Sequence, residues 1–425
     1  CPRKLLTMII SVFTSIHMWT MVKFEYRKLW NRVSLVAVTV MCIISTFHTF
    51  VYLNMNGQWK AISTDGQIVS GLSAYRVLRD ASKDIEGVID DAYLQKLKEQ
   101  YENSIDKQYL DEHRGFLGTG GMTKNMYPNY FINYAYYSYY MSNGNDKMGL
   151  EYDFLDSEKD FYQKYREAVK EQLMYENQYA GPMKFTESQI EVLDQKITGI
   201  DTPVNVAYCQ GISNFMNWYD IEYPLFFVVY AFALSCVYAK DSPSGINELT
   251  LSSAEGRKKD FRARWIAGNL FAVSTYLLFV RVLLIEHGAV ATFGGFGASA
   301  QTYWFSCIFN ISIGAGMIFK IVGGLFGILV FANFTMLLSC LFRNSKTAAV
   351  FSILTVGALT KLSNTYSQIK LLYPNQFSSD AAVHGFFFLG RIIVPYLMVA
   401  LLLAAAYIGI FVYLLGKKDE KYFIN

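Results

Sequence analysis

Residues 223–285 read YPLFFVVYAFALSCVYAKDSPSGINELTLSSAEGRKKDFRARWIAGNLFAVSTYLLFVRVLLI. Two apolar runs, 223–239 and 265–285, flank a polar segment, 240–264, that carries six basic side chains. Each run is close to the ~20 residues that a helix needs to cross a bilayer. Basic residues beside a membrane span mark its cytoplasmic face. The stretch therefore predicts two membrane-spanning helices joined by a cytoplasmic segment.

Similar apolar runs recur along most of the chain, which has 425 residues and is 52% hydrophobic. We predict an all-α polytopic membrane protein with six transmembrane helices and a large, mainly helical extracytoplasmic domain between the first and the second. One long span within residues 303–342 fits the charge pattern better than two short spans, which are the alternative. The six predicted spans are 33–53, 223–239, 265–285, the span within 303–342, 348–362 and 392–415.

Charge separates the polar insertion from the rest of the chain. Residues 55–218 hold 16 Lys+Arg and 24 Asp+Glu, a net charge of −8, and the remaining residues carry +11. Short basic loops are retained in the cytoplasm, whereas long insertions are translocated largely regardless of charge. We therefore expect both termini inside and residues 54–218 outside the plasma membrane. The insertion has only Cys209 and no internal disulfide, which favours a bacterial protein.

The predicted organisation divides the chain into segments. Residues 1–32 form a cytoplasmic or interfacial helix, and the first span, 33–53, leads into the extracytoplasmic domain, 54–218. Residues 219–416 contain the other five spans and the cytoplasmic segment 240–264, and 417–425 form a cytoplasmic tail. Residues 363–390 are expected to be a broken, partly re-entrant external element. Met18 and Met21 are candidate starts of the natural chain, which leaves the status of residues 1–17 open.

The sequence gives no sign of catalysis. It lacks the GxxxxGK[ST] loop that binds ATP, and GTGG at 118–121 has no following lysine. The five histidines are scattered, and none stands in an HExxH arrangement. We expect no catalytic residue, metal site or bound cofactor in this chain, and no nucleic acid among its partners.

The cytoplasmic segment carries a more specific pattern of glycine, glutamate, leucine, serine and arginine. Its members are Gly245, Glu248, Leu249, Leu251, Ser252 and Arg257. This pattern resembles the coupling-helix region of permease subunits of type-2 ATP-binding-cassette exporters. Ala254 stands where that family often has proline, and Asn269 where it often has lysine. The basic helix before the first span, the large insertion and the broken element before the sixth span extend the resemblance over the membrane portion.

The resemblance implies a transmembrane subunit of an ATP-driven exporter that has no ATPase site of its own. Its partners would be two separate ATP-binding subunits, which hold ATP and Mg²⁺, a second permease half, identical or homologous, and membrane lipids. The short helix between the two spans would dock in a cleft on each ATPase, where Glu248 would accept hydrogen bonds or pair with a basic residue. The alternative for the basic cluster is anchoring to anionic lipid.

The substrate is expected to be hydrophobic or amphipathic, with an antimicrobial peptide or a drug as the first guess. Lipid, glycan precursors and sodium stay open. A receptor or scaffold with an extracytoplasmic ligand-binding domain and no transport is the alternative function. An ion-coupled transporter is disfavoured, because the predicted spans lack the buried carboxylates that ion coupling needs.

Several further side chains carry expectations. Gly323 and Gly327 form a small-xxx-small pair that predicts close helix packing, within the chain or against the second permease half. A tyrosine-rich run is a candidate external surface for substrate or partner, with a place in a core or at a membrane interface as the alternative; its members are Tyr127, Tyr130, Tyr134, Tyr137 and Tyr140. Four basic side chains near span ends are expected to reach the interface: Arg281, Lys320, Lys361 and Arg391.

Overall fold

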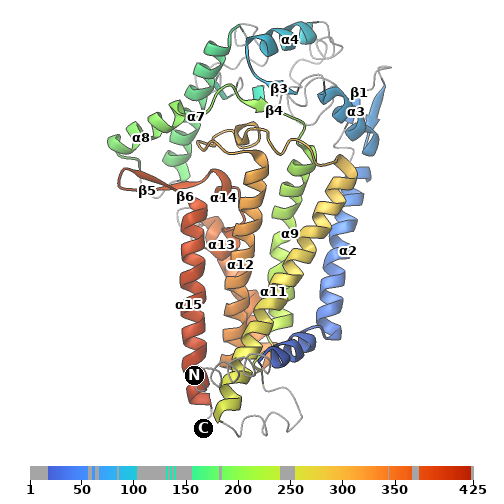
Figure 1. The fold of residues 1–425 in the computed structure, drawn as a ribbon, viewed down its shortest axis with the longest axis vertical. Helices are drawn as coiled ribbons and strands as arrows, with labels where there is room; N and C mark the ends of the chain where they lie inside the picture. The colour runs from blue at the N-terminus through green and yellow to red at the C-terminus, as the bar shows by residue number, and fades with distance from the viewer. Residues whose placement is uncertain are drawn as a thin grey trace, which may run out of the picture.

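Long helices run along the long axis of the molecule, and shorter helices and strands cover one end of them (Figure 1). The computed structural model describes residues 18–55, 60–62, 67–83, 86–102, 131–132, 135, 138–139, 156–180, 184–239, 254–342, 344–365 and 373–422. Structural statements below concern these residues.

Four helices contain stretches long and apolar enough to cross a membrane. They are α2 (Arg32–Met55), α11 (Ala254–Ala291), α12 (Ile313–Phe342) and α15 (Tyr396–Tyr422). At ~1.5 Å per residue each of them is longer than the ~30 Å hydrocarbon layer. Large apolar side chains such as Phe47 on α2 and Leu402 on α15 are exposed on their outer faces. The prediction of a mainly helical membrane protein is confirmed.

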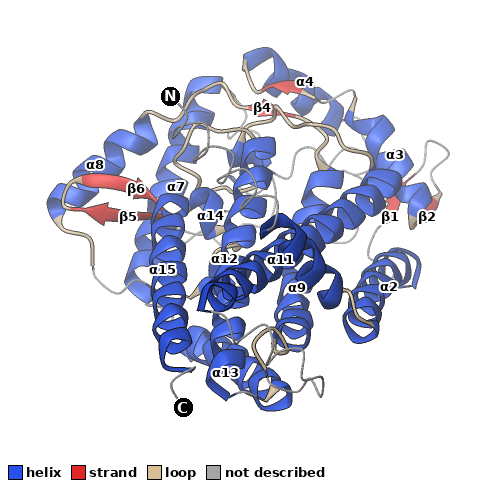
Figure 2. Cartoon of the chain, turned by 60° about the horizontal axis from the view of Figure 1, so that its bottom comes forward, coloured by secondary structure: helices blue, strands red, loops and turns tan. Residues whose placement is uncertain are grey.

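Two further long helices, α9 (Gln210–Leu234) and α13 (Ser345–Thr365), complete what we call the bundle. Helix α9 packs against α2, α11, α12 and α13, and the oblique view with the bottom of the molecule turned forward shows α2 beside α9 and α11 (Figure 2). The hydropathy of α9 is reduced by Asp220, Glu222 and several tyrosines, many of which are buried inside the bundle. A mean hydropathy taken over all residues of a helix does not distinguish polar side chains that face the protein interior from polar side chains that would face lipid.

The bounds of several helices differ from the predicted spans. Helix α9 begins at Gln210 rather than at residue 223, and α11 begins at Ala254, so the basic residues up to Arg264 lie on its first turns. Helix α12 is a single helix starting at Ile313, in agreement with one span rather than two. Helix α15 starts at Tyr396, because the preceding residues form a strand.

An N-terminal helix covers residues 18–29 and lies at an angle to α2, at the end of the bundle opposite the strands (Figure 1). Its apolar side chains Val22 and Leu29 are buried. Trp30, in the turn that follows, packs edge-on against Phe271 of α11 with ring centroids 5.1 Å apart. The side-chain Oδ1 of Asn31 accepts a hydrogen bond from the backbone N–H of Ser34 at 3.0 Å, which caps the start of α2. Residues 1–17 lie outside the described part of the chain.

The elements from β1 to β4, here called the head, cover the other end of the bundle. They are β1 (Lys60–Ile62), β2 (Ile68–Ser70), α3 (Leu72–Ser82), β3 (Gly87–Val88), α4 (Asp91–Glu102), α7 (Glu158–Ala180), α8 (Glu187–Thr198) and β4 (Asn205–Val206). The strand pairs β1–β2 and β3–β4 are antiparallel. Tyr162 on α7 fastens the second pair, because its hydroxyl donates to Ile89 O at 2.9 Å and accepts from Val204 N at 2.7 Å. Burial raises the pKa of this phenol.

The head shares its apolar core with the loops that connect the helices of the bundle. Phe305 and Ile308, which follow the short helix η2 (Ala300–Thr302), are buried in the same cluster as the side chains of α7 and α8. The hairpin of β5 (Phe386–Leu389) and β6 (Ile392–Pro395) adds Phe388, whose ring lies 5.2 Å from that of Phe185. Gly390 turns this hairpin with a φ of 63°. Head and bundle therefore form one continuous structure.

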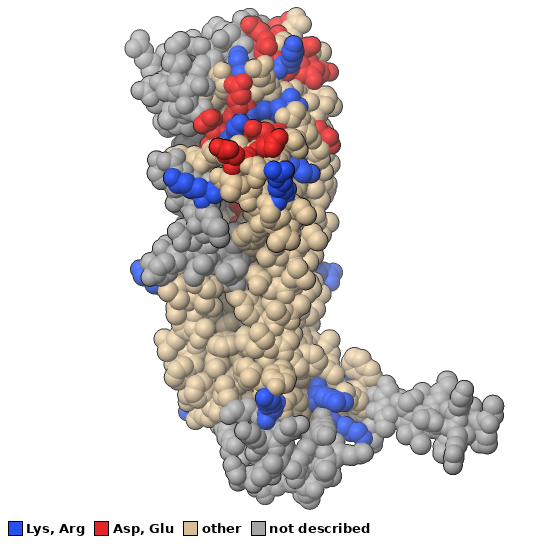
Figure 3. All heavy atoms as spheres, turned by 90° about the vertical axis from the view of Figure 1, so that its left-hand side faces the viewer, with Lys and Arg blue, Asp and Glu red and all other residues tan. Residues whose placement is uncertain are grey.

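Charged side chains are unevenly distributed along the molecule. In the side view, carboxylates gather on the head, an almost uncharged belt covers the middle, and basic side chains lie at the opposite end (Figure 3). An apolar belt between two charged ends is the surface that a lipid bilayer requires. The acidic part of the sequence, residues 55–218, thus contributes to one end of the molecule, and basic residues from outside this range lie at the other end.

Candidate functional site

The predicted coupling segment lies mostly outside the described residues. This applies to Gly245, Glu248, Leu249, Leu251 and Ser252, and to the side chain of Arg257, whose backbone belongs to the first turns of α11. The structure instead describes the two points at which the segment of residues 240–253 joins the bundle. These are the end of α9 and the start of α11, both at the basic end of the molecule.

The two attachment points are fastened to each other and to α12. Tyr238, beyond the end of α9, donates its hydroxyl to Phe261 O on α11 at 3.0 Å, and its backbone N–H to Ser339 Oγ on α12, also at 3.0 Å. Arg264 Nη1 donates to Val237 O at 3.2 Å and its guanidinium pairs with Asp260 at 2.9 Å. We call residues 240–253 the tether; the bundle residues on its two sides, Val237 and Tyr238 before it and Phe261 and Arg264 after it, are bonded to each other.

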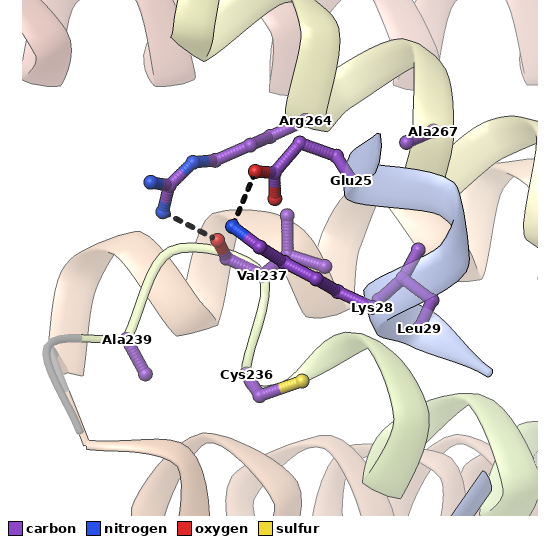
Figure 4. Close-up of a pocket in the computed structure, with 8 residues that line it drawn as sticks. All are labelled: Glu25, Lys28, Leu29, Cys236, Val237, Ala239, Arg264 and Ala267. Carbon is purple, nitrogen blue, oxygen red and sulfur yellow. Dashed lines mark hydrogen bonds and ion pairs between the residues drawn. The ribbon is translucent and has the colours of Figure 1, made fainter. Parts of the chain in front are cut away.

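A cavity of about 170 Å³ opens beside these attachment points (Figure 4). The N-terminal helix, the end of α9 and the first turns of α11 surround it; its lining residues are Glu25, Lys28, Leu29, Cys236, Val237, Ala239, Arg264 and Ala267. Two polar contacts belong to its lining: the ion pair of Lys28 with Glu25 at 2.6 Å, and the hydrogen bond that Arg264 donates to Val237 O. The tether thus leaves the bundle beside a charged recess.

Polar side chains also link α11 to α12 close to the tether. Trp265 Nε1 donates to Asn333 Oδ1 at 2.7 Å, and Asn333 Nδ2 donates to Asn269 Oδ1 at 2.8 Å. Asn269, where the resembling family often has lysine, is thus a partner within the bundle. A Cβ atom at Gly268 would lie 2.5 Å from Met336 Sδ, so the two helices approach closely here. Displacement of the tether would therefore act on α11 and α12 together.

The glycine pair of α12 packs against the element that precedes α15. A Cβ atom at Gly323 would overlap Phe377 O, and one at Gly327 would overlap Tyr223 Oη and approach Pro374 O. The element consists of η4 (Pro374–Gln376) and α14 (Ala381–His384), which lie against α12 without crossing the bundle. The close packing is therefore within this chain, between α12 and the turn formed by η4 and the residues that follow it.

Lys320 does not reach the interface, contrary to the expectation from its sequence position. Its side chain is 1% exposed, and Nζ lies 2.7 Å from Asp220 Oδ2 of α9 and 2.7 Å from Asp380 Oδ1 beside α14. Sequence reasoning failed because both carboxylates lay outside the predicted spans. In the structure the three charges fasten α9, α12 and the element of η4 and α14 together. The side chains of Arg281, Lys361 and Arg391 are exposed.

Asp380 is expected to make stability depend on pH. Burial raises the pKa of its carboxyl. The charge of Lys320 and the hydrogen bond from its Nζ together lower the pKa by more than burial raises it, so the pKa lies below the ordinary value of 3.8. A pKa that is lower in the folded state contributes stability above the unfolded-state pKa, which is lost as the pH falls through the folded-state pKa. Thermal unfolding of Asp380→Asn should therefore depend less on pH below about 4 than that of the wild type. Glu191→Gln, on the exposed face of α8, is the control, and equal slopes in all three proteins would contradict the prediction.

The helices that contain two of the predicted spans nevertheless carry carboxylates within the bundle, outside the predicted bounds. Glu222 on α9 is 1% exposed, and Glu286 on α11 accepts hydrogen bonds from hydroxyls of α2. Both residues border the predicted spans 223–239 and 265–285 but lie well inside the observed helices. The signal in the sequence was the pair of acids at positions 220 and 222 directly before an apolar run.

The tyrosines proposed as an external surface, Tyr127, Tyr130, Tyr134, Tyr137 and Tyr140, lie outside the described residues. Three neighbours in the same run, Phe131, Ile132 and Ala135, are buried in the core of the head. At these positions the run serves the core, whereas the surface role of the tyrosines stays a prediction.

Within the described ranges, no group of three or more His, Cys, Asp or Glu side chains is placed to hold a metal ion. Comparisons of the chain with protein-family models, with curated proteins and with solved structures gave no match. Function must therefore be argued from the arrangement of the chain itself.

Proposed function

We propose that this chain is the permease subunit of an ATP-driven exporter of the type-2 ATP-binding-cassette class, in a bacterial plasma membrane. The observation that carries the proposal is the tether of residues 240–253, whose ends are held together by Tyr238, Phe261 and Arg264. A short segment fixed at both ends to long helices is suited to receive force from a partner. Its sequence carries the Gly245 and Glu248 pattern of a coupling helix.

The six helices of the bundle support this assignment. Four of them have the length and composition of spans, and α9 and α13 pack among them as the second and fifth. Six spans would place both ends of the chain, together with the basic tether, on the cytoplasmic side and the acidic head outside. The short helices η4 and α14 before α15 are compatible with the broken external element that the resemblance implies.

The head shares its core with the loops between α11 and α12 and between α13 and α15. A tilt of those helices would therefore move the head without an additional hinge. Such coupling suits a head that receives or releases a hydrophobic or amphipathic substrate, with an antimicrobial peptide or a drug as the first class to test. The proposed complex contains two ATP-binding subunits, which supply ATP and Mg²⁺, and a second permease half.

The test is co-purification of the tagged chain with an ATPase encoded by a neighbouring gene. The wild type should retain the ATPase and show ATP hydrolysis that depends on substrate. Glu248→Arg, or a scrambled order of residues 245–256, should reduce both at least about tenfold, since it removes a charged contact at a docking site. Glu191→Arg, a charge reversal on the exposed surface of the head, is the matched control.

Retention of full assembly and hydrolysis by both tether variants would show that the coupling assignment is wrong. A chain that binds an extracellular ligand but neither retains an ATPase nor moves the ligand would instead be a receptor or scaffold.

A further inference from the structure

A group of polar side chains lies between α2, α9 and α11, away from the tether. On α2, Ser45 and Thr49 are one helical turn apart and fully buried. Their hydroxyls each donate to Glu286 Oε2 at 3.3 Å, and the hydroxyl of Thr46 donates to Glu286 Oε1. Glu222 of α9 completes the group.

Glu222 is the residue that this packing leaves unexplained. Its side chain is 1% exposed. Among the described residues, no donor meets the distance and angle of a hydrogen bond to either of its carboxylate oxygens. His48 Nδ1 stands 3.7 Å from Oε1, beyond hydrogen-bonding distance, and its ring stacks on Trp218. A buried carboxylate without donors costs several kcal/mol unless a proton or a cation neutralises it.

Two features favour a cation. The negative charges of Glu222 and Glu286 repel each other. A single cation bound near both carboxylates would offset this repulsion and the cost of burying Glu222. The Ser45 hydroxyl bonds to Glu286 and also lies beside Glu222, which places a neutral oxygen between two carboxylates. Carboxylate and hydroxyl oxygens are hard ligands, which bind hard cations rather than soft transition metals.

We infer that Glu222, Glu286, Ser45 and Thr49 form a binding site for an alkali-metal cation inside the bundle, between α2 and the α9–α11 pair. The site joins α2 to the rest of the bundle through charge and fixes the position of α2 when the cation is bound. The titratable groups that face it are Cys42 and His48 of α2, Glu222 of α9 and Glu286 of α11. The inference rests on these contacts alone and does not require an ATPase partner.

The experiment compares thermal unfolding of the purified full chain in detergent with NaCl, KCl or choline chloride at equal ionic strength. NaCl is expected to raise the midpoint by at least about 3 °C over choline chloride, because a ligand that binds only the folded state stabilises it. The KCl arm shows whether the site distinguishes the two alkali cations. Glu222→Gln and Glu286→Gln should each remove the shift, and Glu191→Gln on the head should keep it.

Direct binding of radioactive sodium to the same proteins covers a variant that folds poorly. Ser45→Ala, which removes one neutral ligand and leaves both charges, should weaken sodium binding at least about tenfold. Equal midpoints in all three salts, or a sodium shift that survives in Glu222→Gln, would overturn the site. A stabilisation that follows pH but not the cation would also overturn it, because Glu222 then holds a proton. None of these results depends on transport or ATP hydrolysis.

Discussion

Replacement of Lys320 by methionine is expected to lower the free energy of unfolding by about 3 kcal/mol. The methionine would leave Asp220 and Asp380 facing each other without the ammonium group that now lies 2.7 Å from both. Loss of one partner of a buried ion group costs ~3–5 kcal/mol, because charge then stays buried without compensation. The two carboxylates are 38% and 47% exposed, so water screens part of the loss and the lower end of that range applies.

Unfolding by titration with SDS in mixed micelles measures this loss. Lys361→Met removes a lysine exposed on α13 and should change the free energy of unfolding by less than about 0.5 kcal/mol. A triple variant that also carries Asp220→Asn and Asp380→Asn removes all three charges and should recover most of the stability. If Lys320→Met were as stable as Lys361→Met, the ion triad would not hold the element of η4 and α14 in place.

Gly323→Ala is expected to destabilise the protein by about 2–4 kcal/mol, although it adds one methyl group. The new Cβ would overlap the backbone carbonyl oxygen of Phe377, which cannot swing aside as a side-chain tip can. The turn would have to move away from α12 and take with it Asp380, three residues further along the chain. The substitution should therefore weaken the contact of Asp380 with Lys320 as well.

The control for this substitution has the opposite sign. Gly357 on α13 has no atom within 4 Å of an added Cβ, so Gly357→Ala should stabilise the helix by about 0.5–1 kcal/mol. SDS titration of both variants gives the comparison. The double variant Gly323→Ala/Lys320→Met should be less destabilised than the sum of the two single losses, because both act on the same contact. Strict additivity would show that the glycine and the ion triad are independent.

The relation between head and bundle illustrates how far local sequence patterns reach. The protein has three strand pairs among the described residues, and each strand is only two to four residues long. Strands this short give no clear alternation of apolar and polar residues in the sequence. Strand β3 pairs with β4, which lies far from it in the sequence. The β5–β6 hairpin directly precedes the apolar helix α15, which hides its pattern. The residues of β6 fall within the predicted last span, 392–415. Isoleucine and valine are common in both strands and membrane helices, so these residues do not show locally that they form a strand.

The sequence by itself determined the membrane class, a first span within two residues of α2, one helix rather than two after residue 312, and the separation of acidic and basic regions. These follow from length and hydropathy, which act locally. Only the tertiary structure decided that Lys320 and Glu222 are buried, that Gly323 faces the carbonyl of Phe377, and that the bundle residues on the two sides of the tether are bonded to each other. The fate of a charge or of a glycine depends on which distant residues pack against it, and spacing along one helix does not contain that information.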